Sequence, residues 1–133
     1  MTLSKFEDLE IYQLAEKLSE LVWEKVIKWD YFPRSTVGAQ YVEAADSVGA
    51  NISEGYGRGS FADRSRFAKI SRGSLFETKT WLTKAKNRKL ISEDLSKNFT
   101  KDIDLIGKKL YSYINSIGKQ SPVDLMQTNE NDR

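Results

Sequence analysis

Four successive stretches of the chain carry apolar residues at steps of three and four, which is the spacing of one face of an α-helix. The first repeat runs from Ile11 to Trp29, and the last, which is the most regular, runs from Phe99 to Ile117. No β-pattern of consequence is present, because strict apolar and polar alternation is missing. The periodicity therefore predicts an all-α protein in which each helix buries one face.

Residues that break helices divide these repeats. Pro33 cannot continue a helix, so we expect a break over residues 30–34 and a second helix that starts near residue 36. Gly55, Gly57 and Gly59 alternate in a predicted turn that ends this second helix. The predicted helices span about residues 5–29, 36–54, 61–88 and 93–117.

Serines stand at the predicted starts of three helices. Ser4 opens a capping box, and Ser60 and Ser92 are the predicted caps of the last two helices. Short links between helices of this length make neighbours antiparallel, which predicts an up-down-up-down four-helix bundle over residues 1–118. Residues 119–133 have no helical period and are predicted to form a flexible tail.

The chain contains neither histidine nor cysteine. Histidine is the commonest general base and transition-metal ligand, and cysteine supplies thiolate ligands and nucleophiles. Their joint absence argues against an enzyme and predicts neither a cofactor nor a metal site. No apolar run approaches the roughly 20 residues that span a bilayer, and the N-terminus lacks a signal-peptide core, so we expect a cytoplasmic protein without membrane contact.

Basic residues are concentrated in one part of the chain. Residues 58–89 carry ten basic and two acidic side chains, a net charge of +8, although the whole chain has a net charge of only +2. On the third predicted helix, four cations and one aromatic ring fall on the side opposite to the apolar face. With one arginine just before this helix, they are the candidate nucleic-acid-binding residues: Arg58, Arg66, Lys69, Arg72, Phe76 and Lys84.

A basic face that includes an aromatic ring suits phosphates and bases, so it predicts RNA or DNA binding with little sequence preference. Two alternatives stay open. The cations can pair with the acidic first helix of the same or a neighbouring subunit, with Phe76 as an oligomer contact. They can also dock an acidic partner, such as a nucleic-acid-processing enzyme, on a purely protein-binding scaffold.

Large apolar residues also lie outside the inward faces. Tyr12, Trp23 and Ile27 lie off the inward stripe of the first helix, and Trp81 is near the margin of the third. Exposed apolar side chains at helical spacing predict a subunit interface, and a broader core is the alternative.

The glycine turn has polar neighbours. Asn51, Glu54 and Arg58 offer a ligand site at the end of the second helix, although a carboxylate and a guanidinium four residues apart more often pair locally and order the turn. The alternating glycines do not indicate a phosphate loop, because they follow a helix and lack the Gly-Lys-Ser/Thr ending.

Several motifs of the chain match a known family. They are Phe6-Glu7-Asp8-Leu9 with Tyr12, the run Asn51-Ile52-Ser53-Glu54-Gly55-Tyr56-Gly57-Arg58, Arg66-Phe67, and Gly73-Ser74. Over about residues 6–117 the chain resembles the four-helix-bundle family encoded in intervening sequences of bacterial 23S ribosomal RNA genes. That family is related to the accessory variability determinant of diversity-generating retroelements.

The resemblance implies a homo-oligomer, a ring of five subunits, and a role in binding nucleic acid or a nucleic-acid enzyme. It does not imply catalysis. The family's usual basic doublet on the second helix is replaced here by Glu43 and neutral neighbours, so a nucleic-acid contact from that helix is not expected.

Overall fold

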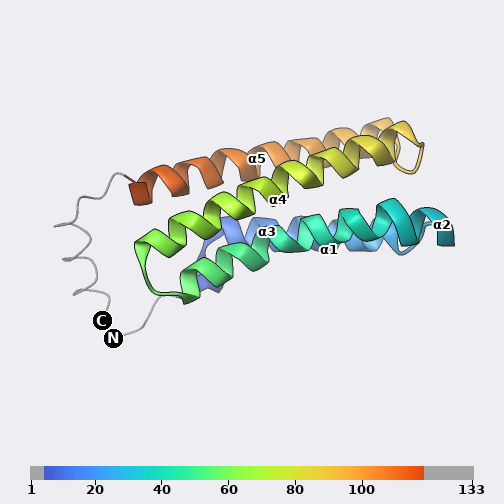
Figure 1. The fold of residues 1–133 in the computed structure, drawn as a ribbon. Coiled ribbons are helices and arrows are strands. Elements are labelled where there is room, and N and C mark those ends of the chain that lie inside the picture. Colours follow the sequence, from blue (N-terminus) through green and yellow to red (C-terminus); the bar gives the residue numbers. More distant parts are fainter. Residues whose placement is uncertain (1–4, 119–133) are drawn as a thin grey trace.

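Four long helices form the part of the chain that the structure describes. The computed structural model describes residues 5–118, so the predicted cap Ser4 and the predicted tail 119–133 lie outside the described residues. The long helices are α1 (Glu10–Val26), α3 (Ala39–Gly57), α4 (Phe61–Asn87) and α5 (Glu93–Gly118). Consecutive long helices run in opposite directions along the bundle (Figure 1). The predicted all-α four-helix bundle is confirmed.

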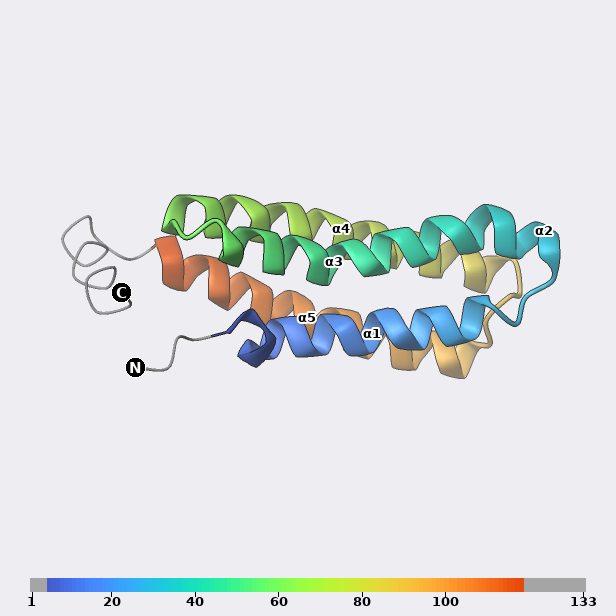
Figure 2. The same cartoon turned by 90° about the horizontal axis from the view of Figure 1, so that it is seen from below.

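The order of the helices around the bundle is α1, α3, α4 and α5. Each of these helices contacts the next, and α5 closes the circle against α1. The view in Figure 2 shows α3 beside α4 and α1 beside α5. The side formed by α1 and α3 and the side formed by α4 and α5 therefore lie on opposite sides of the molecule.

The inward faces of the four helices meet in one apolar core. Its largest fully buried apolar side chains are Leu18, Val22, Tyr41, Val48, Leu75, Leu82, Ile106 and Leu110. Burying one such side chain stabilises the fold by about 1.5–3 kcal/mol relative to leaving it exposed. The face of α4 is the polar part of this core, because Ser71 and Thr78 are also buried. The hydroxyl of Ser71 donates a 2.7 Å hydrogen bond to the carbonyl oxygen of Val48 and so ties α4 to α3.

The first helix is shorter than predicted at both ends. A 3₁₀ turn (Phe6–Asp8) precedes it, and Leu9 is extended, so α1 begins only at Glu10. At the other end α1 stops at Val26. The amide of Trp29 still donates to the carbonyl oxygen of Val26 at 3.0 Å, in a tight turn that buries the indole.

The predicted start of the second helix near residue 36 is wrong. Asp30 has a non-helical backbone, and the helical turn α2 (Tyr31–Pro33) follows it directly. A π-helical turn (Arg34–Gly38) then leads without interruption into α3. Pro33 lies in the first turn of this helical segment, where a backbone N–H has no partner within the helix. Pro33 lacks a backbone N–H, but no hydrogen bond is lost at this position. Pro33 is therefore compatible with the start of a helix and does not end one.

The predicted glycine turn is also shorter than expected. Gly55 and Gly57 belong to α3, and only Gly59 has a positive φ, of 81°. Gly55 is needed for close packing, because an added Cβ would come within 2.7 Å of the Cβ of Phe67 in α4. The predicted caps that follow are both present: Ser60 accepts from the amide of Asp63 at 3.1 Å, and Ser92 accepts from that of Leu95 at 3.2 Å.

Candidate nucleic-acid interface

The outer face of α4 carries cations that have few acidic neighbours. Between residues 64 and 92 the only acidic residue is Glu77, and its carboxylate accepts from the indole N–H of Trp81 at 3.4 Å. Lys69 and Lys84 form no ion pair within residues 5–118. The prediction that this helix presents a solvent-facing basic surface therefore fits the placement of these two lysines.

The two predicted arginines at the α3–α4 turn are held by the protein itself. Arg58 pairs with Glu54 at 2.9 Å, and Arg66 pairs with Asp63 at 3.2 Å. Both guanidinium groups also lie over the ring of Phe67, at 5.2 and 4.7 Å from its centroid. The ion pair between Arg58 and Glu54 supports the interpretation that these two residues pair locally and order the turn. Both side chains remain about half exposed, so their charges are still accessible.

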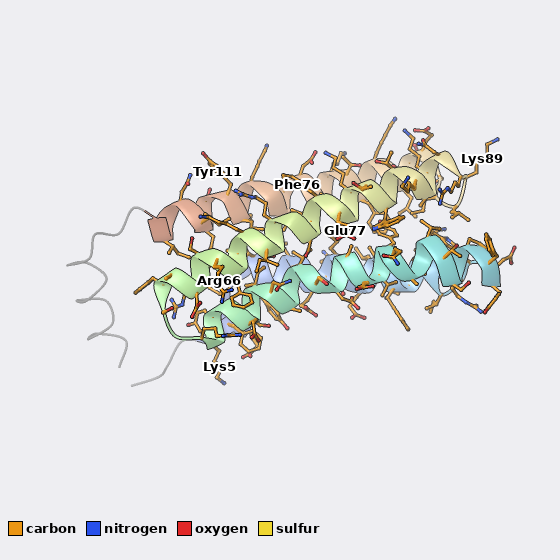
Figure 3. All side chains as sticks on the ribbon, in the orientation of Figure 1. Lys5, Arg66, Phe76, Glu77, Lys89 and Tyr111 are labelled. Atoms are coloured by element: carbon orange, nitrogen blue, oxygen red, sulfur yellow. The ribbon has the colours of Figure 1, made fainter. Side chains whose placement is uncertain are left out.

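The other two predicted residues, Arg72 and Phe76, belong to a different surface. They line an open groove of about 620 Å³ between α4 and α5. Figure 3 shows Phe76 on the α5 side of α4 and Glu77 on the α3 side. The structure thus divides the single predicted stripe into an outer face, with Lys69 and Lys84, and a flank that turns toward α5.

Sequence reasoning missed the α5 wall of this groove. Lys108 and Tyr111 lie there opposite Arg72, Phe76 and Lys79. Tyr111 is 60% exposed and Phe76 is 62% exposed. Tyr111 lies outside the inward repeat of its helix, between the buried Leu110 and Ile114, so the argument applied to Trp23 could have found it. We name this surface the α4–α5 groove.

The α1–α3 side contains a second open groove, of about 540 Å³. Trp23 and Ile27 from α1 and Val42 from α3 supply apolar walls, and Trp23 and Ile27 are 51% and 44% exposed. These two predicted interface residues are therefore placed together. Tyr12 and Trp81 do not lie with them, because each is half-buried against the core of its own subunit. We name this surface the α1–α3 groove.

Carboxylates gather beside the α1–α3 groove. Burial raises the pKa of the Glu16 carboxyl, and the nearby Asp46 and Glu20 carboxylates raise it further. Asp46 accepts a 2.6 Å hydrogen bond from the hydroxyl of Ser19. Within residues 5–118 none of these three carboxylates has an ion-pair partner.

The described chain offers open surfaces rather than a metal centre. Among residues 5–118 no three His, Cys, Asp or Glu side chains lie close enough together to hold a metal ion. In the same range no helix is long and apolar enough to cross a membrane. Fold and surface thus define a small helical-bundle protein with charged faces and open grooves between its helices.

Comparison with known proteins identifies the family. Residues 7–112 match the 23S rRNA-intervening sequence protein family, and the chain belongs to it. The resemblance found in the motifs is therefore confirmed. No curated protein sequence matches the chain.

The fold recurs in a crystal structure of a Bacteroides thetaiotaomicron protein of unknown function from the S23 ribosomal protein family. The similarity covers 79% of this chain and 95% of that protein, with a TM-score of 0.72 and 21% sequence identity. At this level of identity the likeness supports the bundle fold.

Proposed function

We propose that this protein is a non-enzymatic nucleic-acid-binding protein that contacts phosphates through the outer face of α4. The observation that carries the proposal is the pair Lys69 and Lys84, which have no acidic partner within residues 5–118. Lys69 is exposed and Lys84 is partly exposed. Two such cations without local carboxylates are free to replace the counterions of a phosphate backbone.

The shape of this face supports the same proposal. Lys69 and Lys84 are 15 residues apart on one helix, which corresponds to about 22 Å, and one strand of a duplex presents roughly six phosphates over that length. The side chains between them include Gly73, Thr80 and Thr83, which are small. Both threonine hydroxyls donate to backbone carbonyl oxygens of α4, so they stay close to the helix. A phosphate backbone can therefore approach the helix closely at these three positions, and Arg66 and Arg58 extend the positive charge toward the α3–α4 turn.

The proposal is tested with the double variant Lys69→Glu/Lys84→Glu. Fluorescence anisotropy with labelled single-stranded and duplex RNA and DNA, across a series of salt concentrations, gives the affinity and its salt dependence. Losing two phosphate contacts is expected to weaken binding and to reduce the slope of log K against log salt by about 2. The effect should be similar for different sequences, since phosphate contacts do not read bases.

The matched control is Lys17→Glu/Lys28→Glu, which makes the same change in net charge on exposed residues of α1 and the turn after it. α1 lies diagonally across the bundle from α4, so this control should retain most of the affinity. Equal losses in the two variants would show that only net charge matters and would contradict a defined face. If the unaltered protein binds none of the probes at about 50 mM salt, the nucleic-acid proposal fails and docking of an acidic protein partner is the alternative to test.

Self-assembly would strengthen this function. The ring of five subunits that the family resemblance implies would repeat the α4 face around the assembly. Several weak contacts to one strand then act together and raise the overall affinity.

A further inference from the structure

The α4–α5 groove carries one exposed aromatic ring on each wall. Phe76 comes from α4 and Tyr111 from α5, and both side chains are at least 60% exposed. Figure 3 shows the two residues where α4 and α5 run side by side. A single exposed ring is common on protein surfaces, but two rings across one groove form a surface on which flat groups can stack.

The register of the two helices spaces these rings along the groove. Lys79 of α4 is ion-paired with Asp104 of α5 at 3.2 Å, so these two residues lie at about the same level. The helices are antiparallel, and counting from this pair puts Phe76 level with Gly107, which precedes Tyr111 by one helical turn. The rings are therefore offset by about four residues, or roughly 6 Å, along the bundle. Stacked bases are about 3.4 Å apart, so one base between two rings needs a similar space of roughly 7 Å.

Gly107 leaves the wall opposite Phe76 without a side chain. It lies in the interior of α5, where glycine is destabilising relative to alanine. Packing does not require this glycine, because within the described chain an added Cβ would approach only Leu75 Cδ2, at an ordinary contact distance of 3.6 Å. The glycine thus helps to keep open the groove of about 620 Å³, whose floor contains the buried Leu75 and Ile103.

The charge around the two rings is mainly positive. The groove is lined by three cations and one carboxylate: Arg72, Lys79, Lys108 and Asp104. Asp104 is paired with Lys79, whereas Arg72 and Lys108 form no ion pair within residues 5–118. Arg72 also lies about one helical turn from Lys69, so the groove borders the outer face of α4. A strand whose phosphates follow that face can turn its bases toward the rings.

We infer that the α4–α5 groove binds unpaired bases of a single-stranded nucleic acid, with a base between Phe76 and Tyr111 and the backbone near Arg72 and Lys108. This site rests on the proposed function, because α4 must hold the strand, and it names the ligand as single-stranded. A duplex keeps the faces of its bases inside its own stack, so it cannot use the rings. Stacking accepts every base, so the preference for single strands comes with little sequence preference. An acidic protein segment would also match the cations, but it does not need a gap of one base thickness between two rings.

A strand without bases tests this site. Fluorescence anisotropy compares an oligothymidylate of about eight nucleotides with an abasic strand of the same length and with a hairpin duplex. The unaltered protein is expected to bind the thymidylate at least about tenfold more tightly than the abasic strand, because one stacked base contributes about that much. Phe76→Leu/Tyr111→Leu should remove this preference, since leucine keeps an apolar surface but has no ring.

A matched control and a second variant complete the design. Tyr31→Leu/Phe32→Leu makes the same pair of changes on α2, where both rings are at least 73% exposed, and should keep the wild-type preference. Gly107→Leu fills the groove and leaves both rings in place. It should lower the affinity for the thymidylate by about tenfold without lowering that for the abasic strand. This variant replaces the double variant if circular dichroism shows that the latter is unfolded.

Two outcomes would overturn the single-strand site. Equal affinity of the unaltered protein for the thymidylate and the abasic strand means that the groove holds no base, and an acidic protein segment is then the occupant to test. A preference that survives in Phe76→Leu/Tyr111→Leu places the stacked base elsewhere.

The phosphate contacts of the outer face are separated from base stacking by the ratio of the two affinities. Lys69→Glu/Lys84→Glu should weaken binding of the thymidylate and the abasic strand alike and leave their ratio unchanged. A wild-type ratio near one with a normal effect of the lysine changes contradicts the groove site alone. A tenfold ratio without any effect of the lysine changes contradicts the outer-face contacts alone, and binding of no probe contradicts both.

Discussion

Tyr41 is a fully buried residue whose polar group has no partner. Its ring contacts the ring of Phe99 edge-on, with the centroids 6.3 Å apart. Its hydroxyl makes no hydrogen bond within the described chain, and burial raises its pKa well above the usual value for tyrosine. A buried hydroxyl without a partner lowers stability, since it gives up its hydrogen bonds to water.

Tyr41→Phe keeps the ring and removes this hydroxyl, so we expect the free energy of unfolding at pH 7 to rise by about 1 kcal/mol. The raised pKa means that the folded state favours the neutral phenol. Its contribution is complete below the unfolded pKa of about 10 and is lost as the pH rises further, so the variant should lose less stability than the wild type at alkaline pH. Urea unfolding at one protein concentration, at neutral and at alkaline pH, measures both effects. A less stable variant would mean that the hydroxyl has a hydrogen-bond partner.

Residue-level features were predictable where one local interaction decides them. Ser60 and Ser92 cap their helices as expected, because a cap depends only on residues within one turn. Pro33 was misinterpreted, because the same residue fits a break and a first helical turn. The close contact of Gly38 with Val26 and Trp29 brings the start of the α3 segment against α1, and this packing is not visible in the local sequence.

At the scale of the helices, Gly55 allows α3 and α4 to pack close together. A Cβ at Gly55 would also come within 3.2 Å of the carbonyl oxygen of Asp63, and neither that backbone atom nor the Cβ of Phe67 can move aside easily. Gly57, two residues later in the same helix, has no atom within 4 Å of an added Cβ. Close packing of α3 against α4 therefore requires a glycine at position 55, whereas no neighbouring atom requires one at position 57.

We expect opposite effects from the two alanine substitutions. Gly55→Ala should lower the free energy of unfolding by about 1–3 kcal/mol through overpacking. Gly57→Ala should raise it by about 0.5–1 kcal/mol or leave it unchanged, because alanine is the better helix former and meets nothing. Chemical denaturation of both variants gives the comparison. Stabilisation by Gly55→Ala would show that α3 and α4 can separate at little cost.

The helix pattern could be predicted from the sequence, but the groove surfaces could not. Apolar periodicity depends on one helix at a time and placed α5 correctly at Glu93. The groove between α4 and α5 depends on which helices are neighbours and how each is rotated, so Arg72 and Phe76 could not be separated from Lys69 in advance. Lys79 illustrates the point, since its ion pair with Asp104, at 3.2 Å, joins residues 25 positions apart.

At the scale of the whole molecule, positive and negative charges lie on different sides of the bundle. The +8 charge of residues 58–89 was visible in the sequence, and the fold places it on α4, diagonally across from α1. The ring of five subunits that the family resemblance implies would present the outer face of α4 once in every subunit.

This arrangement predicts that assembly and nucleic-acid binding are linked through strand length. Trp23→Glu places a carboxylate in the α1–α3 groove at a predicted subunit contact, so we expect light scattering to show a monomer. This variant should bind an oligonucleotide of about 22 Å, which one α4 face can cover, as tightly as one wild-type subunit does. For a strand that reaches several subunits, its affinity should fall by at least about tenfold, because linked sites gain in effective concentration. Anisotropy titrations with both lengths measure the difference. An equal loss for the short strand would mean that Trp23→Glu disturbs the α4 face itself.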